Sequence, residues 1–153
     1  MNLPTRLDSA IKKLYAAFHE GRLHPECCTQ CAVGTICDNS DAWRHLSDAH
    51  GSPHVNYVGL VHQRLGRTIN GYTPLELLKI EAVFLAACGY GVPLSRDSVR
   101  PVDPSNKDIL FKGLCAVVAH LCLLDGVKDV MDYSQLFQYT PRRTSCNNEG
   151  ATV

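Results

Sequence analysis

Four of the eight cysteines of this chain fall within eleven residues, inside the segment HPECCTQCAVGTIC that runs from His24 to Cys37. They are Cys27, Cys28, Cys31 and Cys37. Thiolates bind zinc and iron strongly, and bind magnesium or calcium weakly. A group of thiols this close in sequence therefore predicts a site for a transition metal, zinc or iron, or a redox centre.

The spacing of these cysteines fits one face of a short helix. A proline opens the range 25–33, where it suits the first position of a helix, and the residue after this range is a glycine, which would end it. In such a helix Cys27 and Cys31 lie about 40° apart around the axis, and Cys28 and Cys31 about 60° apart. Cys37 can fold back from the following turn. The pattern C-C-x2-C-x5-C matches no zinc-finger or ferredoxin spacing, so any site needs a further group from elsewhere in the chain.

Glu81 is the best candidate for that further group. It projects from the middle of the apolar face of an expected helix over Pro74 to Cys88. A buried carboxylate without a partner costs several kcal/mol or takes up a proton. We predict that Glu81 is a metal ligand or, beside an iron ion with an open position, a catalytic base. The alternative is a core glutamate held by backbone donors or by a basic side chain.

The cysteine segment also allows two other interpretations. Adjacent thiols can cycle between dithiol and disulfide, as in a thiol-based redox enzyme or sensor. Unpaired cysteines are also among the most buried residues, so they can simply fill the core of a structural or interaction module. If the chain is an enzyme, we expect an oxidoreductase with an iron or thiol centre.

The cysteines and histidines elsewhere in the chain are weaker candidates for the site. Cys115 and Cys122 share an apolar stripe and are expected in the core, and Cys88 could reach the cluster from its helix end. His24 could cap the cysteine helix or complete the metal site. The remaining candidates are expected at the surface or at helix edges: His45, His50, His54 and His120.

Helices must position these residues, because apolar side chains recur at helical intervals along most of the chain and no alternating strand pattern occurs. The clearest helix start is Thr73-Pro74-Leu75-Glu76, which combines an N-cap, a proline at the first position and a capping-box glutamate. The sequence predicts an all-α single-domain bundle of about six helices over residues 1–139, with a weak last helix over Met131–Phe137. A disordered polar tail is expected over residues 140–153.

The composition bounds the class of protein. The chain has 153 residues, 45% of them hydrophobic, with 15 basic and 15 acidic side chains. This balance gives no electrostatic reason to expect nucleic acid or an anionic membrane as a partner, and no apolar run is long enough to span a bilayer. No signal peptide is apparent, so we expect a cytoplasmic protein with reduced thiols. Nucleotide-binding and common hydrolase motifs are absent, and the sequence identifies no protein or small-molecule partner.

Four phrases carry a resemblance to known proteins: HPECCTQCAVG, NYVGLVHQRLGR, NGYTPLELLKIEA and KGLCAVVAHLC. They resemble a group of short bacterial proteins labelled as the FAD- and NADH-binding subunit of the sodium-translocating NADH:quinone reductase, over the chain up to about Tyr139. That reductase subunit joins a membrane helix to a plant-type [2Fe-2S] ferredoxin domain and to domains that bind FAD and NADH. None of those features can be placed on this sequence. We therefore expect the label to be a misassignment, and it supplies no site residue here.

Overall fold

The computed structural model describes residues 4–95, 97–128 and 138–141. This part of the chain is all-α and contains no β-strand, as the sequence predicts, with five α-helices where about six were expected. The elements in chain order are α1 (Thr5–His19), α2 (Ala32–Ile36), a short 3₁₀ helix η1 (Arg44–Leu46), α3 (Tyr57–Arg64), α4 (Pro74–Ala87) and α5 (Lys107–Leu124).

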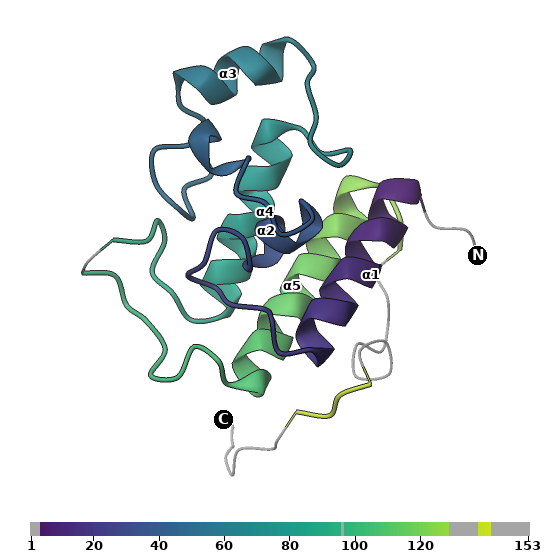
Figure 1. Cartoon of the computed structure of the whole chain (residues 1–153), viewed down its shortest axis with the longest axis vertical. Coiled ribbons are helices and arrows are strands. Elements are labelled where there is room, and N and C mark those ends of the chain that lie inside the picture. Colours follow the sequence, from purple (N-terminus) through teal and green to yellow (C-terminus); the bar gives the residue numbers. More distant parts are fainter. Residues whose placement is uncertain (1–3, 96, 129–137, 142–153) are drawn as a thin grey trace.

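The five-residue helix α2 lies against both α1 and α4, and α5 packs against α1 and α4 as well (Figure 1). The helix α3 lies at one end of the molecule, against η1 and the start of α4. Each of the three long helices buries an apolar face in the common core. The cysteine segment and α4 are therefore brought together although they are about fifty residues apart in the sequence.

Local sequence signals set the start of α4, the helix that contains Glu81. The Thr73 side chain accepts a hydrogen bond from the Glu76 backbone N–H, and the Glu76 carboxylate accepts one from the Thr73 backbone N–H. Both partners of the predicted capping box are thus present. Arg6 of α1 then joins Glu76 at 2.9 Å and Asp125, just after α5, at 2.7 Å. These bonds fix the ends of α1, α4 and α5 relative to one another.

The expectation for the cysteine segment was wrong. The helix of the cysteine segment begins at Ala32 and has Gly34 in its interior, whereas residues 25–30 form turns. Its start is set by Cys31, which has extended backbone angles and whose sulfur accepts a hydrogen bond from the Gly34 N–H, as an N-cap does. After Trp43 the chain forms only the single turn η1. The helix α3 leaves most of its apolar side chains exposed, because it approaches η1 through Gly59.

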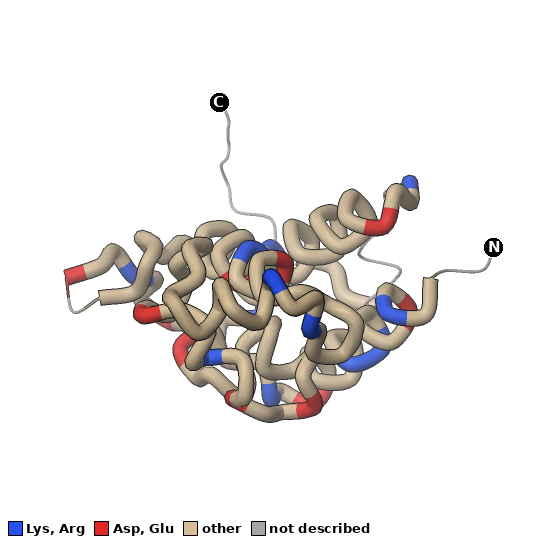
Figure 2. Tube along the Cα trace, turned by 90° about the horizontal axis from the view of Figure 1, so that it is seen from above, with Lys and Arg blue, Asp and Glu red and all other residues tan. Residues whose placement is uncertain are grey.

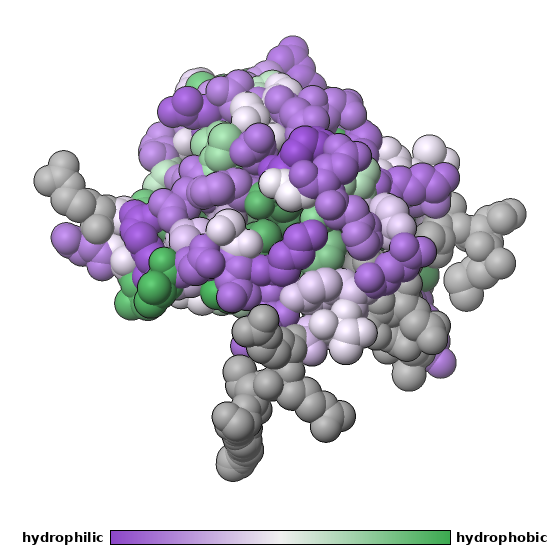
Figure 3. All heavy atoms as spheres, turned by 60° about the horizontal axis from the view of Figure 1, so that its bottom comes forward, coloured by the Kyte–Doolittle hydropathy of each residue, from purple (hydrophilic) through white to green (hydrophobic). Residues whose placement is uncertain are grey.

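Acidic and basic residues are interspersed along the described chain and form no large region of one sign (Figure 2). The face seen in Figure 3 is mostly hydrophilic, with smaller hydrophobic areas between the polar side chains. Within the described residues, no helix is both long enough and apolar enough to cross a membrane. The expected helix over Met131–Phe137, and positions 142–153 of the expected tail, lie outside the described residues.

Candidate metal centre

Three potential metal ligands meet at the centre of the molecule. The Cys31 sulfur, a ring nitrogen of His50 and a carboxylate oxygen of Glu81 all lie within 4.8 Å of one another. Cys31 is the N-cap of α2, His50 lies in the loop after η1, and Glu81 lies in the middle of α4. Among the described residues, this is the group of histidine, cysteine and acidic side chains with the spacing of a metal site.

The carboxylate of Glu81 is completely buried, as the helical pattern predicts, with 0% of its side chain exposed. One oxygen, Oε1, accepts a hydrogen bond of 3.2 Å from the Val33 backbone N–H at the start of α2. The other, Oε2, lies 2.7 Å from Nε2 of His50. In the described part of the chain, no lysine or arginine forms an ion pair with this carboxylate. The buried carboxylate is thus held by a backbone N–H and an imidazole, with the Cys31 thiol beside it.

Cys31 is also fully buried, and its thiol lies beside the Glu81 carboxylate. Burial raises the pKa of this thiol well above its ordinary value, and the nearby carboxylate raises it further. The Gly34 N–H, which donates to the sulfur over 3.3 Å, acts in the opposite direction. The Cys31 thiol and the Glu81 carboxylate therefore lie side by side. A bound cation would lower the electrostatic repulsion between the thiolate and the carboxylate.

His50 was expected at the surface or at a helix edge, but it lies mostly buried in a loop. Its side chain is 14% exposed, its ring packs edge-on to the indole of Trp43 with 5.6 Å between ring centres, and Nε2 meets Glu81. Helical periodicity could not find this residue, because it lies in an irregular loop. The one available signal was that a buried Glu81 requires a partner. That signal did not select His50 from the seven histidines of the chain.

The structure separates the other predicted cysteine ligands from this group. Cys27 lies in the turn before α2, and its sulfur forms a 3.1 Å hydrogen bond with the Thr29 hydroxyl. Cys37 is the C-cap of α2, at the opposite end from Cys31, and a helix of this length keeps their backbones about 9 Å apart. Its sulfur is near Lys13, and burial raises its pKa to about 12. Cys28 lies closest to the group, because its carbonyl oxygen is 3.7 Å from the Cys31 sulfur.

The cysteines outside the segment have structural surroundings. Cys88 packs onto Gly113 of α5, close to the Ile109 carbonyl, and burial raises its pKa to about 12. Cys122 is buried in the core as expected, and Cys115 is half-buried. Cys146 lies outside the described residues. His24 caps the turn that follows it, since its Nδ1 accepts a hydrogen bond from the Glu26 backbone N–H.

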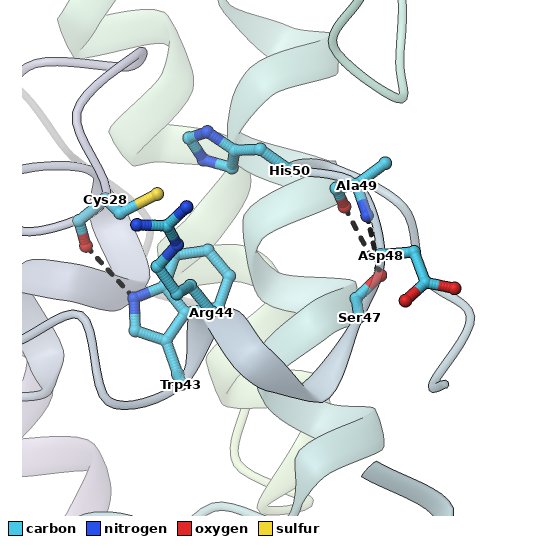
Figure 4. Close-up of a pocket in the computed structure, with 7 residues that line it drawn as sticks. All are labelled: Cys28, Trp43, Arg44, Ser47, Asp48, Ala49 and His50. Atoms are coloured by element: carbon cyan, nitrogen blue, oxygen red, sulfur yellow. Dashed lines mark hydrogen bonds between the residues drawn. The ribbon is translucent and has the colours of Figure 1, made fainter. Parts of the chain in front are cut away.

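An open pocket of about 140 Å³ leads from the surface to the ring of His50 (Figure 4). The Cys28 thiol, the Arg44 guanidinium and the His50 ring point toward the same space. The indole of Trp43 closes one side of it and donates a 3.0 Å hydrogen bond from Nε1 to the Cys28 carbonyl. The remaining lining residues are Ser47, Asp48 and Ala49. Of the three potential ligands, only His50 borders this pocket, so solvent reaches the group past His50.

The three side chains could hold a metal ion, and their spacing can be compared with that of ligands on zinc. Two ligands of a tetrahedral zinc ion, one nitrogen and one oxygen, lie about 3.3 Å apart, and a sulfur and a nitrogen about 3.6 Å apart. The ligand atoms here are within 4.8 Å of one another, and His50 and Glu81 are closer than a metal requires. A metal ion would replace the proton between Nε2 and Oε2, which needs His50 to move by about half an ångström. A loop residue can make this adjustment.

Comparisons with known proteins leave the family of this chain open. Searches against protein-family models, curated proteins and solved structures found no match. The resemblance to proteins labelled as a reductase subunit therefore stays a prediction from the sequence.

Proposed function

We propose that this protein binds one transition-metal ion, zinc or iron(II), through Cys31, His50 and Glu81. The observation that supports this proposal best is the meeting of a buried thiol, an imidazole and a buried carboxylate within 4.8 Å. Sulfur, nitrogen and oxygen donors of this kind suit borderline metals. Three protein ligands leave one position of a tetrahedral ion open, as in sites that carry out chemistry.

The charges of the group also suit a divalent cation. A carboxylate and a thiolate together carry two negative charges, and no lysine or arginine of the described residues forms an ion pair with Glu81. Removing such charges from water is costly unless an opposite charge is bound. The metal would supply that charge, and its binding free energy would add to the stability of the fold. The Val33 N–H would hold the carboxylate in position as an outer partner.

Titration of the metal-free protein with Co²⁺ tests this proposal. Cobalt enters zinc and iron(II) sites, and a thiolate ligand gives it a charge-transfer band in the near ultraviolet. We expect one equivalent to bind with this band, and Cys31→Ser to remove the band. His50→Gln is expected to weaken binding at least about a hundredfold, because even outer partners of metal ligands contribute 10- to 100-fold. Cys27→Ser is the matched control, since Cys27 is in the same segment but outside the group.

Two results would contradict the proposal. One is binding of less than about a tenth of an equivalent of cobalt, zinc or iron under anaerobic conditions. A preformed site for a divalent metal fills at micromolar metal concentrations. The other is a full charge-transfer band in Cys31→Ser. If cobalt binds as expected, the metal content of the protein purified without chelator distinguishes zinc from iron.

A thiol-based redox role is the second candidate, and Cys27 is the residue that favours it. This cysteine is only half-buried, and the hydrogen bonds from Thr29 lower the pKa of its thiol. A larger thiolate fraction at an accessible position gives faster oxidation. We expect mild peroxide to modify Cys27 several times faster than Cys37 and Cys88, whose pKa values are raised by burial. Equal rates, measured by mass spectrometry of the peptides, would remove the support for this role.

A further inference from the structure

The pocket beside the metal group contains one cationic side chain that few other groups engage. Arg44 of η1 lines the pocket, and its guanidinium lies beside the Cys28 thiol (Figure 4). Of the described residues, Asp41 alone forms an ion pair with it, at 3.9 Å and with both side chains more than half exposed. An exposed pair at this distance contributes little. The guanidinium is thus free to bind a ligand.

Apart from the Cys28 thiol, the other polar groups of the pocket are already engaged. The Ser47 hydroxyl donates to the Ala49 carbonyl over 3.3 Å. The Asp48 carboxylate accepts a hydrogen bond from the Asn56 side-chain amide and points away from the Arg44 guanidinium. The Trp43 Nε1–H donates to the Cys28 carbonyl. A ligand that enters the pocket therefore meets a guanidinium on one side and the His50 ring on the other.

The pocket also provides the route to the group of metal ligands. Cys31 and Glu81 are completely buried, and His50 is the one ligand residue that borders the pocket. A molecule from solvent that binds the open position of the metal must consequently approach past His50. Such a molecule would also meet the Arg44 guanidinium, which lines the same pocket.

We propose that this pocket binds a small carboxylate, which occupies the open position of the metal while Arg44 holds it by charge-assisted hydrogen bonds. The inference rests on the proposed metal site. One oxygen of a carboxylate can bind a divalent metal while the other accepts charge-assisted hydrogen bonds from a guanidinium. The size limit follows from the volume: a cavity of about 150 Å³ holds a molecule such as benzene, with six non-hydrogen atoms. The pocket of about 140 Å³ therefore suits a carboxylate of similar size.

The test uses the full chain loaded with Co²⁺ and acetate as the probe, followed by the visible absorption spectrum of the cobalt. We expect a saturable change of the spectrum with acetate and none with acetamide, its neutral counterpart of equal size, at the same ionic strength. Benzoate, with nine non-hydrogen atoms, is expected to bind more weakly than acetate. Arg44→Gln is expected to weaken acetate binding about tenfold or more, because a hydrogen bond to a charged group is lost. Arg64→Gln, on α3 and outside the pocket, is the control.

The possible results separate the two proposals. If cobalt does not bind, the metal site and the carboxylate pocket both fail. If cobalt binds but acetate leaves its spectrum unchanged, or acts equally on the Arg44→Gln variant, the pocket inference alone is overturned. The cobalt spectrum without acetate is also compared between the natural chain and Cys28→Ser. A strong difference would show that Cys28 fills the fourth position of the metal. That result would also overturn the pocket inference while the metal site stands.

Discussion

Glu81→Gln is expected to weaken metal binding at least about a hundredfold while the helical fold remains, since this change removes one of the three proposed ligands and even outer partners contribute 10- to 100-fold. The amide oxygen can still accept the hydrogen bond from the Val33 N–H, which the carboxylate accepts at 3.2 Å. The amide nitrogen can donate to Nε2 of His50 in place of the present bond. Without metal, we therefore expect the free energy of unfolding to change by no more than about 1 to 2 kcal/mol. Cobalt titration and urea denaturation measure the two quantities.

Glu76→Gln is the matched control for this change. Glu76 lies on the same helix, but it belongs to the capping box and to the ion pair with Arg6 and is not part of the group of ligands. It should leave cobalt affinity unchanged. If Glu81→Gln binds cobalt as tightly as the natural chain, Glu81 is not a ligand. If it fails to fold, the carboxylate is needed for the core itself, and the interpretation as a structural glutamate is preferred.

Gly34→Ala is expected to have the largest effect on stability, about 3 kcal/mol, with the melting temperature lowered by roughly 10 °C. A Cβ atom at Gly34 would lie 2.2 Å from the Cys28 carbonyl oxygen and 2.7 Å from the Thr29 carbonyl carbon. Both are backbone atoms, so the turn before α2 must move. That turn carries the carbonyl that Trp43 binds, and the Gly34 N–H binds the Cys31 sulfur. Cobalt affinity should therefore fall as well.

Gly91→Ala serves as the comparison for this change. The nearest atom to a Cβ there is the Val99 backbone nitrogen at 3.3 Å, so a shift of a few tenths of an ångström is enough. We expect a loss below about 1 kcal/mol and unchanged cobalt affinity. Equal losses for the two variants, measured by thermal unfolding, would contradict the close approach of the turn to α2.

The burial of Glu81 shows how far local reasoning reaches. Its place in the middle of an apolar face follows from 3.6 residues per turn, and the structure confirms that it is fully buried. The start of the same helix follows from the capping box, which involves residues only three positions apart. Both features depend on interactions along one helix, so the sequence alone is sufficient to predict them.

The conformation of the cysteine segment was not predictable in the same way. A helix over residues 25–33 is compatible with the local sequence, but the chain turns there and begins the helix at Ala32. The reason lies in distant partners: the Cys28 carbonyl is held by Trp43, and the first turn of α2 is held by Glu81. These contacts place Cys31 toward α4 and leave Cys27 and Cys37 apart from the group.

Three features thus follow from the amino-acid order without any structure: an all-α fold, the position of the helix that starts at Pro74, and a buried carboxylate on that helix that requires a partner. The identity of that partner depends on packing, since His50 and Glu81 are 31 residues apart and His50 lies in a loop without periodicity. Packing also brings Cys31, out of four nearby cysteines, to this group and places Arg44 in the lining of the adjacent pocket. Helix formation depends on neighbours within a turn, whereas a site of three ligands depends on how whole elements pack.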